Sequence, residues 1–584
     1  MTKLNMINSQ SPPKKWSISL FTQIIRRSQF FRWHYRKAAK SGKALSQHIA
    51  SHNIPITDPW KGDANKGQPL ATGITPLIML EQRWHDFAWL RDMREYGGQN
   101  ARTYARRYLL DWIMQHGIWE KATWHPIRLA QRIRSLILTW SWYGQSAPES
   151  QQIQILTSLI IQSGFLQKDL SRLTDNDDRL NAYSAILMDI AFRQPDADIS
   201  TLTSKIFATL DELLMEDGCH VSRRIDKHMT CLGFLHDMRY ALAIIQKTQT
   251  EADITDHLAR LDQQIAMMGA IGRMWRLGDN ALLAMRHGMD APPILTELVL
   301  DKSGPRGKIC QHATQGGFMR MASGRSVVVM NTAPTRNGNL LSPDADADAA
   351  ANAIEFSFQK QRILISSGYH HDLMASHPHL ADLMKGTSAH STLSIDMINS
   401  SQITELTSST MRAPAMAGRN SGHMRAPRQA IATKIDYGPA SGGSLAVAEH
   451  NGYQSLFGAL HERKLYLATG GHILKGQDII RYTGDPGNIP SEAIIRFHLH
   501  PRIHASQTNN RTILLKLPAN MPSWKFICSE GHISLEDSIT AINGHPQRCQ
   551  QIVISVALSE LREHMKLETS WGFVKLARKQ VKPV

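Results

Sequence analysis

The spacing of apolar residues changes once along this chain, near residue 305, and that change limits the folds it can adopt. Before it, apolar residues recur every three or four positions, as in Leu232, Leu235, Met238 and Leu242, the spacing of one helix face. After Ser303–Pro305 the apolar pattern becomes short and alternates with a period of two, as in β-strands. The sequence therefore predicts a helical half followed by a β-rich half.

The helical half has the pattern of a series of antiparallel helices. Short polar breaks such as Gly144–Ser146 and Asp217–Gly218 separate its apolar segments, as in stacked helical hairpins. A chain of 584 residues is too long for one hydrophobic core, so at least two domains are expected. A bundle or toroid of helices is the predicted packing.

The β-rich half contains many short strand-like stretches separated by Gly- and Asn-rich turns, which predicts a large antiparallel sandwich. The alternation in Ile494–His500 predicts a strand with one buried face and one polar face. The predicted strands are Arg325–Asn331, Ile354–Phe358, Arg362–Ser366, Ser391–Asp396, Lys464–Thr469, Ala493–His500, Arg511–Leu517 and Gln551–Leu558.

An excess of positive charge indicates polyanionic partners. Lys and Arg number 66 against 50 Asp and Glu, which gives a formal net charge of +16. The resulting field attracts nucleic acid, anionic lipid or acidic polysaccharide, and charge alone does not choose among these. No nucleic-acid-binding motif accompanies the charge, so we expect no specific binding of nucleic acid.

The first 45 residues are basic, with interleaved aromatic residues, and we treat residues 1–70 as a basic N-terminal segment. They lack the features of a signal peptide, which favours a cytoplasmic location, and no stretch approaches the roughly 20 apolar residues of a membrane span. One interpretation is an amphipathic helix in peripheral membrane contact, with Trp16, Phe21 and Phe30 facing lipid. The favoured interpretation is a basic tail that docks loosely on the body.

Several short motifs occur in a fixed order across roughly residues 75 to 560, and together they resemble the heparinase II/III family. Each motif is weakly specific alone, and the ordered set is a good signal. They are Trp84–Arg94 (WHDFAWLRDMR), Trp124–Arg134 (WHPIRLAQRIR), Glu216–Arg223 (EDGCHVSR), Gly316–Phe318, Ile354–Phe356, Ser388–Leu393 (SAHSTL), Gly476–Asp478 and Arg496–Pro501 (RFHLHP).

The resemblance implies an incomplete (α/α) toroid over residues 71–304, an antiparallel β-sandwich over residues 305–584, and a substrate cleft between them. It implies a polysaccharide lyase of the cell envelope that acts on a uronic-acid-containing acidic polysaccharide by β-elimination. This chemistry needs a cation or amide to neutralise the uronate carboxylate, a base for the C5 proton, and an acid for the leaving oxygen.

Basic residues are densest in the turn that matches the family's DG motif. The resemblance aligns Lys227 with a tyrosine that moves the proton in many relatives, so Lys227 and His220 are catalytic candidates. Arg223, Arg224 and His228 are substrate-binding candidates in the same turn. A lysine acts as a base only where burial or neighbouring cations lower its pKa. The alternative is a basic turn at a solvated helix end, where cations complement the helix dipole.

The family's carboxylate-neutralising Asn or His lies at the start of a helix, where this chain has Asn176 followed by Asp177. Asn176 is a substrate-binding candidate, but Asp177 would repel a uronate. A simpler interpretation is that Asp175 or Asn176 caps the helix. Tyr183, further along the same helix, is a second candidate base.

His390 lies in the AHSTL motif, and we count it among the catalytic candidates; the equivalent histidine joins a structural metal site in some relatives. The two partner positions have changed, because the family's HxHxD run is Asp346–Ala350 here and its VDxG run is Ile365–Gly368. Asp346 replaces a histidine that is catalytic in relatives. With the His-Asp-His set not intact, and no CxxC pair among the five cysteines, we expect no cofactor, although a structural zinc stays possible.

Two functions therefore follow from the sequence. The first is an active lyase on an acidic polysaccharide. The second is a catalytically lapsed relative that binds envelope glycans, because the HxHxD histidines and the tyrosine have changed.

Overall fold

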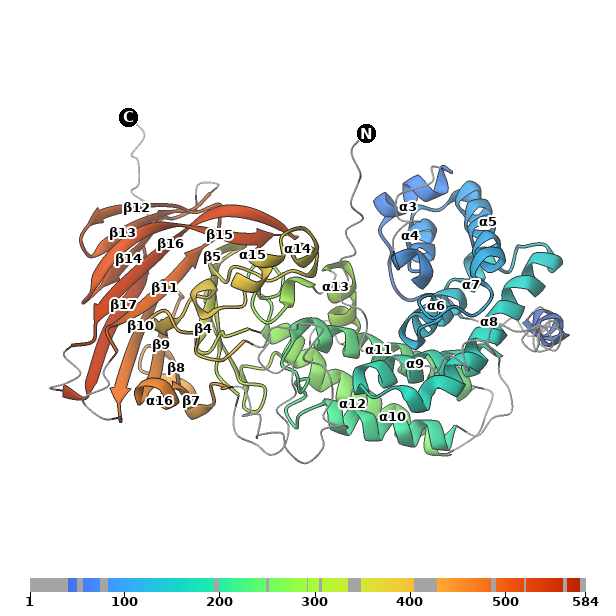
Figure 1. Ribbon diagram of the computed structural model, residues 1–584, viewed down its shortest axis with the longest axis horizontal. Helices are drawn as coiled ribbons and strands as arrows, with labels where there is room; N and C mark the ends of the chain where they lie inside the picture. Colours follow the sequence, from blue (N-terminus) through green and yellow to red (C-terminus); the bar gives the residue numbers. More distant parts are fainter. Residues whose placement is uncertain are drawn as a thin grey trace, which may run out of the picture.

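A helical half and a β-rich half lie along the long axis of the molecule (Figure 1). The predicted order of a toroid-like helical domain and an antiparallel β-sandwich is confirmed in this computed structural model. The structure describes residues 40–49, 56–73, 82–193, 199–247, 252–290, 293–303, 307–334, 348–403, 428–484, 490–518, 521–542, 544–559 and 564–577.

The helical half consists of helices joined by short turns, with α9 packed against both α6 and α11. Its core is rich in tryptophan, and Trp89, Trp112, Trp124 and Trp275 are almost fully buried. The elements are α3 (Ala64–Ala71), η2 (Gln82–Asp86), α4 (Trp89–Tyr96), α5 (Gly98–His116), α6 (Pro126–Leu138), α7 (Trp140–Tyr143), α8 (Glu149–Asp169), η3 (Leu170–Arg172), α9 (Asn176–Arg193), α10 (Ser200–Leu213), α11 (Ile225–Ile245), α12 (Ala252–Met274), η4 (Gly288–Asp290) and α13 (Pro293–Lys302).

The described part of the segment 1–70 belongs to this helical core. Leu45, Ile49 and Trp60 are buried in it. Gly67 allows α3 to approach α4, because a β-carbon at this position would lie 2.2 Å from the carbonyl oxygen of Asp92. Residues 1–39, which include Trp16, Phe21 and Phe30, lie outside the described residues, so the interpretations of this segment stay predictions.

The strands pair antiparallel into two sheets within the described residues, a nine-stranded one ordered β1-β2-β3-β4-β5-β11-β16-β15 with β6 beside β11, and an eight-stranded one ordered β12-β13-β14-β17-β10-β9-β8-β7. Apolar side chains between the sheets, such as Phe356, Phe497, Trp524 and Phe573, form the sandwich core. The strands are β1 (His312–Ala313), β2 (Phe318–Ser323), β3 (Ser326–Asn331), β4 (Ala353–Phe358), β5 (Gln361–Ile365), β6 (Leu393–Ile395), β7 (Ala432–Ala440), β8 (Gly443–Tyr453), β9 (Ala459–Ala468), β10 (Ile473–Tyr482), β11 (Glu492–Leu499), β12 (His504–Asn509), β13 (Thr512–Lys516), β14 (Trp524–Cys528), β15 (His532–Ile542), β16 (His545–Ala557) and β17 (Lys566–Lys575).

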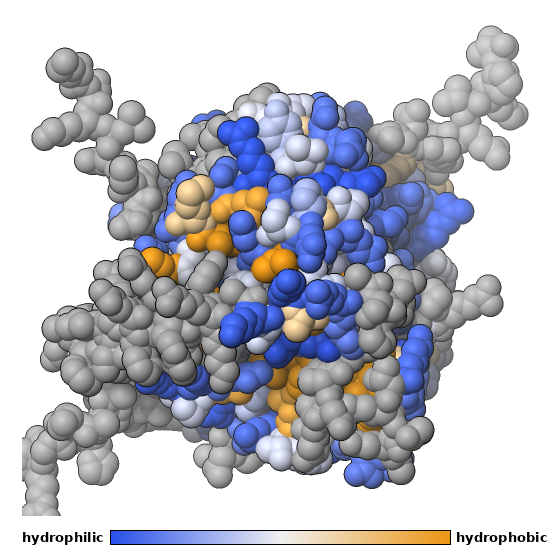
Figure 2. Space-filling view, turned by 90° about the vertical axis from the view of Figure 1, so that its right-hand side faces the viewer, coloured by the Kyte–Doolittle hydropathy of each residue, from blue (hydrophilic) through white to orange (hydrophobic). Residues whose placement is uncertain are grey.

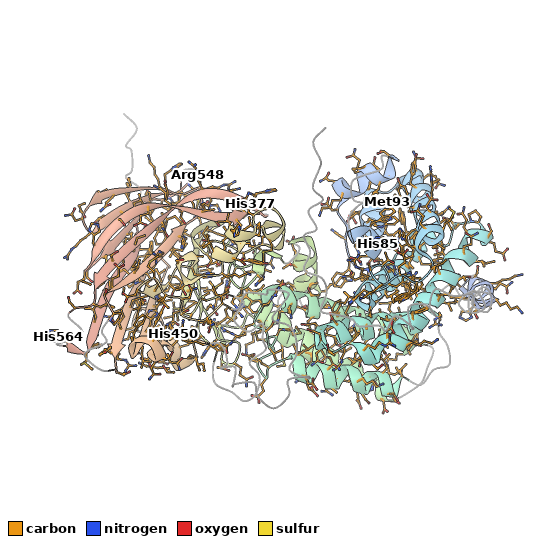
Figure 3. The ribbon with its side chains drawn as sticks, in the orientation of Figure 1. His85, Met93, His377, His450, Arg548 and His564 are labelled. Carbon is orange, nitrogen blue, oxygen red and sulfur yellow. The ribbon has the colours of Figure 1, made fainter. Side chains whose placement is uncertain are left out.

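Three short helices, α14 (His371–Ser376), α15 (Pro378–Leu383) and α16 (Gln454–Phe457), and the 3-10 turn η5 (Thr387–Ala389) complete the β-rich half. His377, which Figure 3 labels near the junction with the helical half, lies between α14 and α15. Figure 1 shows α14 and α15 on the side of the sheets toward the helical half, whereas α16 lies against β8 and β9.

β11 differs from its predicted form, because both of its faces are buried. The predicted polar face carries Arg496 and His498, which are 7% and 2% exposed. Arg496 donates to the hydroxyl of Ser394 at 3.0 Å, and the ring of His498 lies 2.9 Å from the hydroxyl of Ser538 and 2.9 Å from the carbonyl oxygen of Ser388. The alternation of apolar and polar residues in β11 therefore corresponds to two buried faces. The polar side chains of one face are buried because they form hydrogen bonds within the protein.

A chain of buried polar side chains crosses the eight-stranded sheet. His450, labelled in Figure 3, contacts His461 at 3.1 Å between ring nitrogens, and His461 contacts Asp478 at 2.7 Å. Arg463 forms a two-pronged ion pair with the same carboxylate at 2.7 and 2.9 Å, and Trp571 donates to it at 2.8 Å. Burial of charges at this depth requires such complete pairing.

The two halves meet through an extensive junction between residues 274–290 and strands β2 to β5. Trp275 packs edge-on against Phe318 with ring centroids 5.3 Å apart. Arg320 donates to the carbonyl oxygen of Met274 at 3.0 Å, and Arg362 pairs with Asp279 at 2.8 Å. Hydrophobic and charged contacts therefore fix the helical half against the sheet.

Glu355 makes this junction sensitive to pH. The Glu355 carboxylate is fully buried and accepts the backbone N–H groups of Ala284 and Met285 at 2.8 and 2.9 Å. Burial raises its pKa from 4.5 to about 7 against the opposing charge of Arg362. Because the folded pKa exceeds the unfolded one, the folded state binds more protons between these values, and stability falls as pH rises through that window.

We expect Glu355→Gln to be more stable than wild type above pH 7, by up to about 3 kcal/mol, because the amide oxygen still accepts both N–H groups without a buried charge. The gain should disappear below about pH 4.5. Urea unfolding of both proteins between pH 4 and 8 measures the difference. A gain that does not vary with pH would contradict this origin.

The end face of the helical half shows apolar side chains in separate patches among hydrophilic ones (Figure 2). Tyr96, Met114 and Ile118 are exposed large apolar residues of this half. None of the helices within the described residues combines the length and apolarity that a membrane crossing requires.

Candidate active site

The turn between α10 and α11 carries His220, one of the predicted catalytic residues, and is fixed by the β-rich half. A β-bridge joins Leu214 to His220. The Asp217 carboxylate accepts the backbone N–H groups of Gln315 at 2.9 Å and Gly316 at 2.8 Å. His220 is therefore held at the junction of the two halves.

Three side chains from two separate segments meet here, and we call them the Asp177 cluster. The ring of His220 contacts one carboxylate oxygen of Asp177 at 2.9 Å through Nε2, and the ammonium of Lys227 lies 3.1 Å from the other oxygen. The second ring nitrogen of His220 lies 2.8 Å from the hydroxyl of Ser222. The start of α9 thus supplies the carboxylate, and the turn and first residues of α11 supply its partners.

The members of the Asp177 cluster differ in accessibility. Burial would raise the pKa of Asp177, but the hydrogen bond and charge of His220 and the charge of Lys227 lower it well below its usual range. The side chain of His220 is 1% exposed, whereas those of Asp177 and Lys227 are 25% and 23% exposed. A ligand in solvent can therefore reach the carboxylate and the ammonium, but not the imidazole.

Asn176 lies next to this cluster with both ends of its amide engaged. Its Nδ2 donates to Glu212 at 2.6 Å, and its Oδ1 accepts from Arg179 at 3.0 Å. The carboxylate of Asp175 accepts the backbone N–H of Asp177 at 2.9 Å. The predicted helix cap is confirmed, with Asp175 as the capping residue.

Tyr183 lies on α9 about two turns beyond Asn176, and its side chain is largely buried. Within the described part of the chain, its hydroxyl has no hydrogen-bond partner, so no hydrogen bond joins it to the Asp177 cluster. Its role as a base stays a prediction.

Arg223 lies between the two halves of the molecule. Its guanidinium donates to the carbonyl oxygens of Gly316 at 2.8 Å and Thr332 at 2.6 Å, and to Oδ1 of Asn331 at 2.7 Å. It is 2% exposed, and its backbone has a left-handed φ of 56°, which a non-glycine residue adopts at a cost. Arg223 thus joins the halves, and its predicted contact with substrate stays a prediction.

The other two basic residues of the turn also have partners in the protein. Arg224 pairs with Asp226 at 2.6 Å. His228 is fully buried, with Nε2 3.0 Å from the carbonyl oxygen of Met268 and its ring edge-on to Trp275. Burial lowers the pKa of His228 to about 3, so the ring is neutral at pH 7. Their assignment to substrate binding is untested.

Opposite charges are interleaved around the Asp177 cluster, so the site is less positive than the net charge of the chain suggests. An anionic ligand would compete with Asp177 for Lys227. The cations here are Lys227, Arg179 and Arg224, and the carboxylates are Asp177, Asp178, Glu212 and Asp226.

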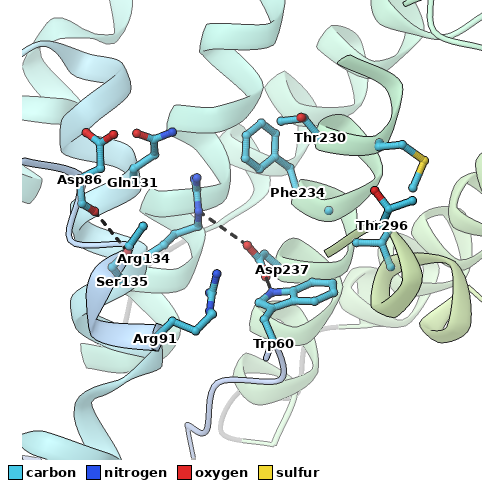
Figure 4. Close-up of a pocket in the computed structure, with 14 residues that line it drawn as sticks. Trp60, Asp86, Arg91, Gln131, Arg134, Ser135, Thr230, Phe234, Asp237 and Thr296 are labelled. Carbon is cyan, nitrogen blue, oxygen red and sulfur yellow. Dashed lines mark hydrogen bonds and ion pairs between the residues drawn. The ribbon is translucent and has the colours of Figure 1, made fainter. Parts of the chain in front are cut away.

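A cavity of about 270 Å³ lies in the helical half, one helical turn from Lys227. Lys227, Thr230, Phe234 and Asp237 share one face of α11 by their spacing, and the last three line the cavity. Figure 4 shows Arg134 of α6 reaching toward Asp237 across it. One face of α11 therefore leads from the Asp177 cluster into the cavity.

Comparison with known proteins identifies the β-rich half. Residues 305–572 match the family model described as heparinase II/III-like, C-terminal. The C-terminal half is a heparinase II/III-like domain. The family resemblance that the ordered motifs indicated is thereby confirmed.

Solved structures extend the likeness to the helical half. A heparinase III gene product has a TM-score of 0.60 at 11% identity, covering 92% of this chain and 89% of that one. The heparan sulfate lyase HepC from Pedobacter heparinus has a TM-score of 0.53 at 12% identity, covering 86% and 77%. A further heparinase III structure has a TM-score of 0.58 at 12% identity, covering 84% and 76%. At these identities the likeness shows a shared fold. No curated protein matches the chain.

The AHSTL motif of the heparinase II/III-like domain places His390 in a buried cluster with Asp348. Burial lowers the pKa of His390, with the charge of Asp348 opposing the shift. The Asp348 carboxylate is bound by Arg286, whose Nη1 lies 2.7 Å from it and whose backbone N–H donates to it at 2.7 Å. His390 is 2% exposed, so this cluster is separate from the surface that Asp177 and Lys227 present.

The residues at this place do not fit the family's metal site. His390 is present, but Asp348 replaces the second histidine of the HxHxD run and Ser366 replaces the aspartate of the VDxG run; the Arg286 guanidinium already occupies Asp348. Among the described residues, no group of three or more His, Cys, Asp and Glu side chains is placed to hold a metal ion. Asp346 lies outside the described residues.

Sequence reasoning missed two parts of the candidate site. Asp177 was considered only as a repulsive charge, although its place beside Asn176 in the aligned run marked it as a site position. The cavity was not predicted, because Trp60, Arg134 and Asp237 come from distant segments. No local motif connects those residues.

Proposed function

We propose that this protein binds an acidic polysaccharide at the Asp177 cluster and cleaves it by β-elimination beside a uronic acid. The observation that carries the proposal is a carboxylate that bridges a buried histidine and a lysine that solvent reaches. The likeness to structures named as a heparan sulfate lyase and as heparinase III supports a polysaccharide as the substrate class.

In the proposed reaction, the uronate carboxylate takes the ammonium of Lys227 away from Asp177. Neutralising the uronate makes its C5 proton removable. Loss of the lysine also raises the pKa of Asp177, because one stabilising partner is gone, while His220 keeps the other oxygen in place. The freed oxygen of Asp177 is then the base, and His220 is a positioning residue.

The bond changes balance within this site. Asp177 accepts the C5 proton, the electron pair of the C5–H bond forms the C4=C5 double bond, and the bond from C4 to the glycosidic oxygen breaks. The protonated Asp177 then returns its proton to the departing oxygen. Tyr183 is the alternative proton carrier that the sequence offers.

Binding without cleavage is a second candidate function. Its support is that Asp177 is held ionised by two partners and that both nitrogens of the buried His220 are engaged. In this case the cluster would hold a glycan through Lys227 without moving a proton. The cell-envelope location expected from the family resemblance is part of both proposals.

Incubation with a panel of uronate polymers tests the first function. Heparan sulfate, hyaluronan, chondroitin sulfate, alginate and polygalacturonate are each mixed with the protein, and ultraviolet absorbance of the conjugated C4=C5 product is followed. We expect product from at least one polymer. Salt-sensitive binding without product from any polymer would exclude the lyase and leave the second function.

A further inference from the structure

The ring nitrogen of His220 that does not contact Asp177 is held by a single residue, Ser222. Nδ1 of His220 lies 2.8 Å from the hydroxyl of Ser222 and accepts the backbone N–H of the same residue at 3.2 Å. Ser222 is 1% exposed, so bulk water does not compete for these contacts. Within the described residues, Ser222 therefore supplies both hydrogen-bonding partners of Nδ1.

The backbone contact decides which ring nitrogen carries the proton. A backbone N–H can only donate, so Nδ1 of His220 accepts and carries no proton itself. The ring proton is then on Nε2, which lies 2.9 Å from Oδ1 of Asp177. His220 is thus the donor and Asp177 the acceptor in the hydrogen bond that joins them.

The hydroxyl of Ser222 is oriented by the residue that follows the turn. The backbone N–H of Arg224 donates to the Ser222 oxygen at 3.2 Å and uses one of its lone pairs. The hydroxyl proton is left to donate to Nδ1 of His220, the acceptor at 2.8 Å. The hydroxyl and the backbone N–H of Ser222 therefore select the same tautomer of His220.

Contacts from outside the Asp177 cluster fix the main chain around Ser222. Nη2 of Arg286 donates to the carbonyl oxygen of Ser222 at 2.9 Å, and Arg286 is itself bound by Asp348. The backbone N–H of His220 donates to Nδ1 of His228 at 3.4 Å, and the other nitrogen of His228 is bound to a backbone carbonyl oxygen. The position of Ser222 against His220 is therefore set by the fold around the turn.

This tautomer suits a base at the other oxygen of Asp177. His220 donates to Oδ1 both when Asp177 is a carboxylate and when it carries a proton on Oδ2, the oxygen beside Lys227. In the opposite tautomer, the lone pair of Nε2 would face Oδ1, which is favourable only when Oδ1 is protonated. That proton would lie between His220 and Asp177, away from the departing glycosidic oxygen.

We infer that Ser222 is a positioning residue of this site. It fixes the tautomer of His220, and His220 in turn directs proton transfer to the oxygen of Asp177 that faces Lys227. The tautomer follows from the hydrogen bonds alone, whereas its part in catalysis rests on the proposed function.

Neutron diffraction from a crystal of the full chain, exchanged into D₂O at pH 7, tests the tautomer without requiring catalysis. We expect deuterium on Nε2 of His220, none on Nδ1, and the O–D bond of Ser222 directed at Nδ1. Deuterium on Nδ1 would overturn the inference. Because the wild-type chain is used, this result does not depend on whether a variant folds.

Substitution of Ser222 tests its part in catalysis on the polymer that gives product. Ser222→Ala should lower kcat about three- to tenfold, the worth of one hydrogen bond, and change KM by less than about twofold. Ser222→Thr keeps the hydroxyl and should recover most of the loss. The matched control is Ser455→Ala, which removes an exposed hydroxyl in α16 and should have no effect. Equal kcat in Ser222→Ala and wild type would overturn the positioning role.

The outcomes separate this inference from the proposed function. Deuterium on Nε2 without product from any polymer would exclude the lyase and the catalytic role of Ser222, while the tautomer would stand. Product together with deuterium on Nδ1 would keep the lyase and overturn the role of Ser222. A loss of activity in Ser222→Ala that follows a loss of stability, and that Ser222→Thr does not recover, would mark a structural role and overturn the inference as well.

Discussion

Asp348→Ala is expected to lower the free energy of unfolding by about 3–5 kcal/mol, because it leaves a buried arginine without its counter-charge. Nη1 of Arg286 lies 2.7 Å from Oδ1 of Asp348, and the two side chains are 1% and 4% exposed. Arg286 also donates to the carbonyl oxygen of Ser222 at 2.9 Å, which links the pair to the turn carrying His220. Urea unfolding followed by tryptophan fluorescence measures the loss.

The pH dependence identifies the cause of this loss. Burial would raise the pKa of Asp348, but Arg286 and the neighbouring histidines lower it well below its usual range. The stabilisation is therefore present above the unfolded pKa, about 3.9, and is lost as pH falls through the folded value. The difference between wild type and Asp348→Ala should shrink in acid.

Two further variants serve as controls for this pair. Asp111→Ala removes the exposed partner of Arg107 and should change stability by less than about 1 kcal/mol. Combining Arg286→Met with Asp348→Leu should recover part of the loss, because neither charge then stays buried alone. A double variant less stable than Asp348→Ala would show that the charge is not the cause.

Lys227→Met is expected to reduce kcat/KM on the responsive polymer by about 10²–10³-fold, because it removes the cation that neutralises the uronate. Initial rates of product absorbance give this ratio. The matched control is Lys247→Met, which changes an exposed lysine just after the other end of α11. Equal activity of Lys227→Met and wild type would remove Lys227 from the reaction.

A structural role of Lys227 would give a different result. Lys227→Arg keeps the charge and should restore part of the activity, whereas a merely structural lysine would affect unfolding in parallel with rate. Asp177→Asn should lower kcat more than it raises KM, because the base is lost while Lys227 remains to bind the carboxylate. These patterns distinguish the two side chains of the cluster.

The fold could be predicted from the sequence because apolar periodicity is a local signal. The change of period near Ser303–Pro305 falls between α13, which ends at Lys302, and β1, which begins at His312. β11 was predicted with one polar face because alternation does not show what covers a polar side chain. Its Arg496 and His498 are buried by contacts with residues more than 35 positions away in the chain.

The candidate site was only partly predictable, because its parts depend on contacts between distant segments. The motif alignment predicted His220 and Lys227 as site residues, and in the structure both contact the carboxylate of Asp177. The same motif gave no sign that Arg223 spans the two halves in a left-handed conformation. The AHSTL motif marked His390 as a candidate, yet the structure buries it beside Asp348, away from the exposed side chains of Asp177 and Lys227.

Hydrogen–deuterium exchange in the presence of a bound oligosaccharide tests the central claim most directly. The ligand is an oligosaccharide of the polymer that gives product in the panel or, failing product, the tightest binding. We predict protection of backbone amides at the start of α9, residues 176–180, and in the turn and first residues of α11, residues 214–231. Protection confined to β7 and β8, at one edge of the eight-stranded sheet, with these two segments unchanged, would contradict the assignment of the Asp177 cluster as the glycan site.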